Sequence, residues 1–211
     1  MSIYPSQKKY FEEAYRTGEH GWPVEGPSEP IVRFFERFKK EKKTGRVLDL
    51  GCGEGRHAAL FAKAGYQTIG LDYQPQALTR ASRLCGKNRA RPHFIVGDLF
   101  HLPLAQNSFD LLIDYGCFHH VRKRDTALYL GIILSLLKPG GYLLLSCFSM
   151  RFKHHPKEKR KRDWLIHKGH YDRFFKLSSF RTIFGESFRQ LHIEEEQQSL
   201  YAFFHVWMQK K

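Results

Sequence analysis

The chain has 211 residues, 42% of them hydrophobic and 18 of them Phe, which suits one α/β domain with a buried core and excludes a disordered chain. No apolar run reaches the about 18 residues of a membrane-spanning helix, and the charged N-terminus lacks the apolar segment of a signal peptide, so we expect a cytoplasmic protein without a membrane partner. The formal net charge of +14 indicates either an anionic partner or a soluble surface, and charge alone does not separate the two.

The predicted elements start after a segment of about 30 residues that Gly and Pro punctuate towards its end. Pro30 then opens a predicted helix whose apolar face consists of Ile31, Phe34, Phe35 and Phe38. Short apolar strands and helices alternate after it. We predict strands at residues 46–50, 67–72, 93–98, 109–114 and 142–148. We predict helices at residues 54–64, 75–86 and 122–137, the last ended by a KPGG turn, and a loop in place of a helix at residues 100–108.

The strands are mostly continuous apolar runs, as expected when helices cover both faces of a sheet. Their alternation with helices therefore predicts an α/β fold with a doubly wound, Rossmann-like parallel sheet and right-handed crossovers. The last third of the chain differs, because it holds a basic segment at residues 151–163 and a short helix after Ser178 and Ser179. Two more strands are predicted at residues 188–196 and 201–209.

The cysteines and histidines show no metal-binding pattern. The four cysteines lie far apart without metal-ligand spacing, so we expect reduced thiols. The twelve histidines include the adjacent pairs His119-His120 and His154-His155. Adjacent residues point in different directions on a helix or a strand, so we expect no metal site.

A glycine-rich loop follows the first predicted strand, in the pattern Asp49-x-Gly51-x-Gly53-x-Gly55. A phosphate-binding P-loop is excluded, because no GK[ST] follows. The GxGxxG pattern of dinucleotide-binding folds is incomplete, because Arg56 occupies the place of the third glycine, which close helix–strand packing requires. A carboxylate at the end of this strand would repel a pyrophosphate and attract a cation.

Two further aspartates end predicted strands. Asp72 ends the second strand, where a carboxylate can accept both ribose hydroxyls, and Asp98 ends the third, where one can face the exocyclic amine of a purine. Each of them alone also fits a helix N-cap or a turn. Together with Asp49 and the glycines, they indicate a binding site for a positively charged nucleoside.

Four sequence stretches occur in the order found in class I S-adenosylmethionine-dependent methyltransferases: VLDLGCGEG, TIGLDYQ, VGDLFHLPLAQNSFDLLID and LLKPGGYLLLS. The chain resembles that family over about residues 45–149. The resemblance implies S-adenosyl-L-methionine as the cofactor and a seven-stranded sheet that ends in an antiparallel hairpin. It also implies one domain with an N-terminal helical cover (1–44), a cofactor-binding core (45–149) and a basic lid with the C-terminal hairpin (150–211).

The resemblance implies a cofactor site made of Asp49, Gly51, Cys52, Gly53, Asp72, Tyr73, Asp98, Leu99 and Tyr115. Asp49 would face the methionine ammonium, and the glycines would let the backbone approach the cofactor. Asp72 would hold the ribose, Asp98 with Leu99 the adenine, and Tyr115 would line the methyl-donor pocket.

The N-terminal stretch YRTGEHGWPVEGPSEP resembles the leader of the thiopurine and tellurite-type small-molecule methyltransferases. A tryptophan in that leader helps to cover the cofactor, and Trp22 matches its position loosely. Packing of Trp22 against the first helix is the alternative.

Methyl transfer from a sulfonium is an in-line displacement, so the enzyme mainly aligns the reacting atoms. A general base is needed only where the acceptor loses a proton. The candidates in the stretch DYGCFHHV are Asp114, Tyr115, His119 and His120, and a histidine suits a base near neutral pH. No NPPY-like tetrapeptide is present, which argues against methylation of the amino group of adenine or glutamine.

The basic segment 151–163 carries seven Lys or Arg against two acids. It is either a lid over a small-molecule site or a clamp for RNA, whose binding would then depend on salt. Aromatic residues are sparse in it, so base stacking is not indicated. We therefore expect a small-molecule acceptor, with RNA methylation or simple nucleic-acid binding as the alternative. The sequence does not determine the oligomeric state.

Overall fold

The computed structural model describes residues 4–18, 22, 26–86, 91–102, 104–153, 160–198 and 201–211. Its helices are α1 (Pro5–Thr17), α2 (Glu29–Glu41), α3 (Arg56–Lys63), α4 (Pro75–Cys85), α5 (Thr126–Leu136) and α6 (Leu177–Phe184). Its strands are β1 (Arg46–Leu50), β2 (Gln67–Asp72), β3 (His93–Val96), β4 (Phe109–Tyr115), β5 (Leu137–Phe148), β6 (Trp164–His167), β7 (His170–Arg173), β8 (Phe188–Gln198) and β9 (Tyr201–Lys210). Its short 3-10 turns are η1 (Leu99–His101), η2 (Phe118–His120) and η3 (Lys123–Asp125). Within these ranges, no helix combines the length and the apolar character needed to cross a bilayer.

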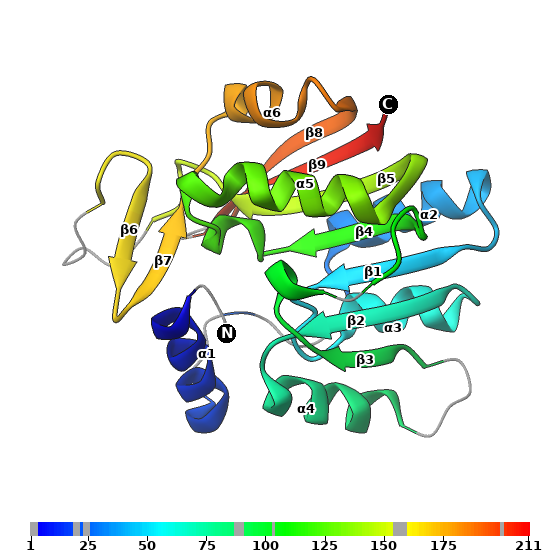
Figure 1. The fold of residues 1–211 in the computed structure, drawn as a ribbon, viewed down its shortest axis with the longest axis horizontal. Coiled ribbons are helices and arrows are strands. Elements are labelled where there is room, and N and C mark those ends of the chain that lie inside the picture. The colour runs from blue at the N-terminus through cyan, green and yellow to red at the C-terminus, as the bar shows by residue number, and fades with distance from the viewer. Residues whose placement is uncertain are drawn as a thin grey trace.

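Seven strands form one sheet in the order β3-β2-β1-β4-β5-β9-β8 (Figure 1). β1 to β5 run parallel, and β9 lies antiparallel between β5 and β8. The predicted Rossmann-like sheet and its C-terminal antiparallel hairpin are therefore confirmed. The chain order reverses between β1 and β4, and open α/β sheets bind ligands outside the carboxyl ends of the strands at such a reversal.

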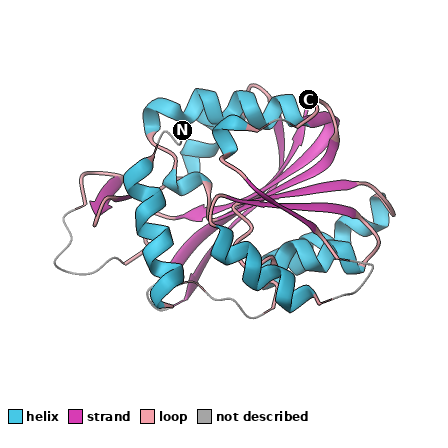
Figure 2. Ribbon diagram, turned by 60° about the horizontal axis from the view of Figure 1, so that its bottom comes forward, coloured by secondary structure: helices cyan, strands magenta, loops and turns pink. Residues whose placement is uncertain are grey.

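The sheet is buried on both faces, because its strands carry apolar residues on both sides. In β4, Leu112 packs into the apolar cluster that includes residues of α5 and α6. Its neighbours Leu111 and Ile113 pack into the cluster that includes residues of α2 and α3. Figure 2 shows helices on both sides of the sheet. This two-sided packing is why the strands read as continuous apolar runs in the sequence.

The start of β5 differs from the prediction. The KPGG stretch, predicted as a turn before the strand, belongs to β5, because Leu137 already pairs with Phe109 of β4. The register between the two strands shifts before Leu111, and Gly140 adopts a left-handed φ of +70°. The stretch is therefore an irregular first part of the strand, and the prediction of a separate turn is wrong.

A separate antiparallel hairpin, β6–β7, is absent from the sequence prediction. Lys168 and Gly169 form its turn with φ values of +48° and +80°, and a two-residue type I′ hairpin requires such left-handed residues at both positions. The Lys-Gly pair between two short runs that contain Trp, Ile and Tyr is a weak form of the Asn-Gly hairpin signal. That pair is the feature by which the sequence could have indicated the hairpin.

α1 and the β6–β7 hairpin lie on the side of the sheet to which the arrowheads of β1 to β4 point (Figure 1). α1 has Pro5 in its first turn and ends at Gly18, which has a φ of +72°. Tyr4 donates a hydrogen bond of 2.6 Å from its hydroxyl to Asp125, and Gln7 donates one of 3.3 Å to the carbonyl of His120. These contacts fix the N-terminal helix beside the carboxyl ends of the strands.

Candidate active site

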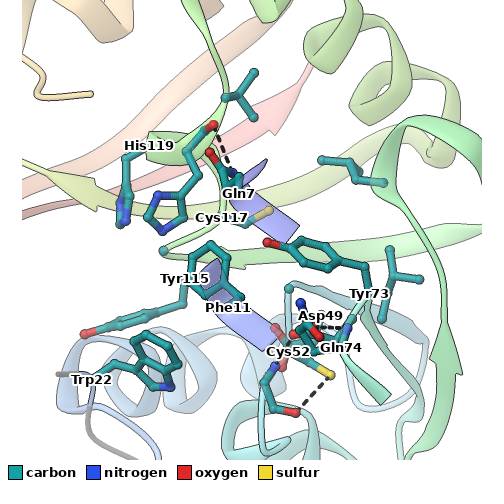
Figure 3. Close-up of a pocket in the computed structure, with 18 of the residues that line it drawn as sticks. Gln7, Phe11, Trp22, Asp49, Cys52, Tyr73, Gln74, Tyr115, Cys117 and His119 are labelled. Carbon is teal, nitrogen blue, oxygen red and sulfur yellow. Dashed lines mark hydrogen bonds between the residues drawn. The ribbon is translucent and has the colours of Figure 1, made fainter. Parts of the chain in front are cut away.

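A cavity of about 860 Å³ opens at the carboxyl ends of β1 to β4, and α1 forms part of its wall. With the exception of the base candidate Asp114, the residues that the sequence predicts for the site line this cavity: Trp22, Asp49, Gly51, Cys52, Gly53, Asp72, Tyr73, Asp98, Leu99, Tyr115, His119 and His120. In Figure 3, Asp49, Cys52 and Gln74 gather at one end of the cavity and His119 lies at the other, with Phe11 between them. The structure thus brings the predicted residues together, and their individual roles stay predictions.

The glycine loop needs its glycines for conformation and for space. Gly51, Gly53 and Gly55 all have left-handed φ values, between +55° and +75°. A Cβ at Gly53 would lie 3.0 Å from the hydroxyl oxygen of Tyr15, at the edge of the cavity. A Cβ at Gly55 would lie 2.7 Å from the ring of Phe94. Gly55 therefore lets the loop pass close to Phe94 of β3, while Arg56 occupies the position of the third glycine of the dinucleotide pattern, as the sequence predicts.

Asp49 is a buried carboxylate without a basic partner close enough for an ion pair among the described residues. Its side chain is 1% exposed, and its Oδ2 accepts one hydrogen bond of 3.1 Å from the backbone N–H of Ala58. Burial raises the pKa of Asp49 to about 8, and the nearby carboxylates of Asp114 and Asp72 act in the same direction. A cation placed beside Asp49 would lower its pKa again and favour the ionised carboxylate.

Asp72 holds the glycine loop through backbone hydrogen bonds. Its Oδ2 accepts one of 2.9 Å from the N–H of Gly53, and its Oδ1 accepts one of 2.8 Å from the N–H of Gln74. Burial raises the pKa of Asp72 to about 6, although these bonds lower it. Each carboxylate oxygen has a second lone pair, so both remain able to accept a hydroxyl from a ligand in the cavity.

Asp98 is fixed in a similar way at the next strand end. Its Oδ1 accepts a hydrogen bond of 3.0 Å from the N–H of Phe100, which makes Asp98 the N-cap of η1. This is the capping role that the sequence left open for an isolated aspartate, and Asp98 lines the cavity as well. Capping leaves the second oxygen of Asp98 for a ligand.

Asp114 does not serve as a base candidate in this structure. It is fully buried, and its Oδ1 accepts hydrogen bonds from the backbone N–H groups of Cys117 and Phe118. Its Oδ2 accepts a hydrogen bond of 2.7 Å from the hydroxyl of Tyr129. The interpretation of Asp114 as a possible base is therefore wrong, because its oxygens fix the turn that carries His119.

The histidines of η2 lie close to each other, contrary to the expectation for adjacent residues. The ring centroids of His119 and His120 are 4.2 Å apart, because η2 is a tight 3-10 turn and neither a regular helix nor a strand. His119 stacks on Phe148 at 3.7 Å between ring centroids. Burial, with His120 and His170 nearby, holds the pKa of His119 well below its usual value, which makes His119 a poor general base at neutral pH.

The sequence prediction missed the contribution of α1 to the cavity. Gln7, Phe11 and Tyr15 follow each other at four-residue spacing and line the cavity from one face of the helix. That spacing is the signal that could have revealed them. Trp22 lines the cavity, and its ring packs 5.6 Å from the rings of Phe11 and of Tyr15, which lie on α1 and not on the predicted helix opened by Pro30. Its role in covering the cofactor stays a prediction.

The basic segment 151–163 is described at both ends, while residues 154–159, which include the pair His154-His155, lie outside the described residues. Arg160 lies 3.6 Å from the centroid of the Phe174 ring and donates hydrogen bonds to two backbone carbonyls. Its guanidinium thus stabilises the chain around it. The prediction of a lid or a clamp for the whole segment stays a prediction.

Comparison with known proteins places the chain among methyltransferases. A family model described as a methyltransferase domain matches residues 47–141. An uncharacterized methyltransferase of Schizosaccharomyces pombe is 30% identical over 122 residues, which are 58% of this chain and 81% of that protein. A probable tRNA methyltransferase 9B of Bos taurus is 27% identical over 158 residues, 73% of this chain but 32% of that protein.

A solved structure with the same fold is the 1,6-didemethyltoxoflavin-N1-methyltransferase of Burkholderia thailandensis, which contains 1,6-didemethyltoxoflavin and S-adenosylhomocysteine. Its TM-score with this chain is 0.77 at 21% identity, and the alignment covers 96% of this chain and 86% of that one.

Proposed function

This chain belongs to the class I S-adenosylmethionine-dependent methyltransferases, and we propose that its acceptor is a small, planar molecule with a nucleophilic oxygen, nitrogen or sulfur. S-adenosylmethionine is its cofactor. When bound, this group supplies an electrophilic methyl carbon on a cationic sulfur. The protein's own part is to hold the donor and the acceptor in line and to keep water out.

We assign the end of the cavity at Asp49 to the cofactor. Buried carboxylates whose pKa values are raised favour a cationic ligand, and S-adenosylmethionine carries an ammonium and a sulfonium. Asp49 would face the ammonium, Asp72 the ribose, and Asp98 with Leu99 the adenine. Gly51 and the neighbouring loop positions let the backbone approach the ligand.

We assign the other end of the cavity to the acceptor. Its walls are aromatic rings from α1, β5, β9 and the loop after β5: Tyr10, Phe11, Phe148, Phe152 and Phe203. Such walls favour a flat acceptor that stacks on them or meets their edges. This aromatic, α1-covered end is the observation that supports a small acceptor most directly. The size of the cavity agrees, because about 300–1,000 Å³ is usual for one drug-sized ligand, and this cavity of about 860 Å³ must take the donor as well.

The proposal is tested by transfer of a labelled methyl group. The full-length protein is incubated with labelled S-adenosylmethionine and panels of phenols, aromatic amines, N-heterocycles and thiols, beside total RNA. We expect label in small aromatic acceptors and none in RNA. Label in RNA alone would contradict the small-molecule assignment.

RNA is the second candidate acceptor, because the net charge is +14 and a relative is named as a probable tRNA methyltransferase. Retention of RNA by the protein would fall steeply as salt rises, since phosphate contacts release counterions. Such retention without methyl transfer would favour a nucleic-acid-binding module.

Shortening Phe152 should affect the acceptor and not the donor. The Phe152 ring lies 4.1 Å from that of Phe148, between ring centroids, in the aromatic end of the cavity. We expect Phe152→Ala to raise KM for the acceptor found in the screen about tenfold, in line with losing roughly 1.5 kcal/mol of apolar contact. The Kd for S-adenosylmethionine, measured by calorimetry, should stay within twofold.

The matched variant is Phe100→Ala, because Phe100 lines the cavity beside Asp98 at the cofactor end. It should weaken S-adenosylmethionine binding and leave the acceptor KM nearly unchanged. If both variants changed the same constant, the division of the cavity into two ends would be wrong.

The affinity for S-adenosylmethionine should rise with pH. Because the pKa of Asp49 is about 8 in the cofactor-free protein, the carboxyl must lose a proton to receive the ammonium. Below that pKa, the association constant should rise up to about tenfold per pH unit. The association constant is best measured between about pH 6 and 7.5, because the ligand's α-ammonium, with a pKa of about 7.7–8.0, stays mostly charged there.

Calorimetry in buffers of different ionisation enthalpy gives both the affinity and the protons released. Asp98→Asn is the control, because it keeps Asp49, so its association constant for S-adenosylmethionine should still rise with pH. A flat profile in the unmodified protein would show that Asp49 is already ionised before the cofactor binds.

A further inference from the structure

Three potential metal ligands meet at the acceptor end of the cavity, from η2 and the β6–β7 hairpin. The Nδ1 of His120 lies 2.9 Å from the Nε2 of His170 and 3.1 Å from the Oδ1 of Asp172. The Nε2 of His170 lies 3.3 Å from the same carboxylate oxygen. Both histidines line the cavity. The three atoms thus form a compact triangle beside the place where the acceptor is proposed to bind.

Hydrogen bonding does not account for this triangle. The Oδ1 of Asp172 is buried and has no aligned hydrogen-bond donor among the described residues, although two imidazole nitrogens lie within 3.3 Å. The Nδ1 of His120 also lies 3.1 Å from the carbonyl oxygen of Tyr171. One ring nitrogen cannot donate to that carbonyl and also accept from His170. A metal ion would bind the two ring nitrogens and the carboxylate oxygen together, and it would replace the hydrogen bond between His120 and the carbonyl of Tyr171.

The dimensions fit a metal ion. Zinc binds imidazole nitrogen at about 2.0–2.1 Å and carboxylate oxygen at about 2.0–2.2 Å, which places the ligand atoms of one tetrahedral ion about 3.3–3.5 Å apart. The observed distances of 2.9, 3.1 and 3.3 Å reach this range when the side chains open by a few tenths of an ångström. Two histidines and one carboxylate are also a known ligand set for divalent transition metals, with coordination positions left open.

The surroundings hold the ligands in place and offer a fourth. The ring of Tyr10 stacks on His170 at 4.2 Å between ring centroids, and Phe148 stacks on His119. A ligand atom of His119 lies within 4.8 Å of those of His120 and Asp172. The Nδ1 of His119 is buried and has no hydrogen-bond partner in the part of the chain that the structure describes.

We propose that His120, His170 and Asp172 bind one divalent transition-metal ion of the zinc type, with an open coordination position towards the acceptor cavity. An acceptor hydroxyl or thiol at that position would have a lowered pKa and lose its proton to solvent. The resulting oxygen or sulfur anion forms a bond to the methyl carbon, and the electrons of the breaking carbon–sulfur bond return to sulfur. This catalytic use rests on the proposed function, whereas the metal site itself does not.

The test uses the full-length protein, freed of metal with a chelator and then dialysed. Co²⁺ is added while visible absorption is recorded, and Zn²⁺ binding is measured by calorimetry. We expect one equivalent of either ion and ligand-field bands for Co²⁺. His120→Ala and Asp172→Asn should each weaken binding at least about tenfold. His101→Ala is the matched control, because His101 is an exposed histidine of η1, and it should bind like the unmodified protein.

Two results would overturn the proposal: no binding by the unmodified protein, or equal binding by His120→Ala and Asp172→Asn, which would place the ion elsewhere. The increase in melting temperature caused by S-adenosylmethionine is measured on every variant, and its persistence shows that the variant is folded. If S-adenosylmethionine did not raise the melting temperature of the unmodified protein, the proposed function would be contradicted. The metal titration would still test the metal site independently.

Discussion

Replacing Asp49 with Asn is expected to weaken S-adenosylmethionine binding at least tenfold and to make the cofactor-free protein more stable. The loss of affinity follows from the proposed role of Asp49, because a hydrogen bond between a carboxylate and an ammonium contributes about 1.5–3 kcal/mol. The gain in stability follows from the pKa of Asp49, which is about 8 in the folded chain. An ionised Asp49 is therefore unfavourable in the fold.

The sign of the stability effect is set by proton binding. Between the unfolded pKa of about 3.9 and the folded value of about 8, the folded chain holds more protons than the unfolded chain, so this group lowers stability as pH rises. A neutral Asn removes that cost at neutral pH. For a domain of this size, each 1 kcal/mol shifts the melting temperature by about 2–4 °C. Thermal unfolding at about pH 5 and pH 8 should show a gain for the variant that is larger at the higher pH.

Asp110 offers the matched control, because its replacement with Asn should change stability in the opposite direction. It is also a buried aspartate, but Lys42 and Lys138 contact its carboxylate at 2.6 and 2.9 Å. Although burial raises the pKa of Asp110, hydrogen bonds from Lys42, the backbone of Arg46 and Lys138 lower it below its usual value. Asp110→Asn should therefore lower stability at neutral pH by up to about 1 kcal/mol, since both lysines are partly exposed, and leave cofactor binding unchanged. A destabilised Asp49→Asn would show that Asp49 is compensated in the fold.

Replacing Gly55 with Ala is expected to cost about 2–5 kcal/mol of unfolding free energy. Gly55 has a φ of +75°, a conformation that costs other residues about 1–2 kcal/mol. A Cβ there would also lie 2.7 Å from the ring of Phe94 and 3.2 Å from the Cβ of Ala81, and overpacking of this kind adds about 1–3 kcal/mol. Because the loop contacts the cofactor site, affinity for S-adenosylmethionine should fall as well.

Gly65→Ala separates the two contributions, because Gly65 has a φ of +91° and open space where a Cβ would lie. Its cost in urea unfolding should be the conformational part alone. Adding Phe94→Leu to Gly55→Ala should recover part of the loss by removing the contacted ring. Equal costs at the two glycines would mean that the contact with Phe94 relaxes freely.

The order of the central strands, and the meeting of Asp49 and Asp72 at one end of the cavity, could be predicted from the sequence. β1 and β2 occupy the predicted residues, because their apolar runs are buried between the two helix layers. Asp49 and Asp72 end these strands, and the carboxyl ends of neighbouring parallel strands must meet at one edge. The order of the predicted strands in the sequence was therefore enough to predict that Asp49 and Asp72 lie together.

The proposed acceptor end depends on long-range contacts that the sequence does not show. His120 and His170 are 50 residues apart and meet because the β6–β7 hairpin lies beside η2, a contact that no local periodicity encodes. The sequence also suggested Asp114 as a base, whereas the fold uses its oxygens to hold a turn. Side-chain direction in a tight turn and the packing of α1 over the strand ends depend on long-range contacts. For that reason the methyl donor could be identified from the sequence, while the proposed acceptor site and its proposed metal ligands could be found only in the folded chain.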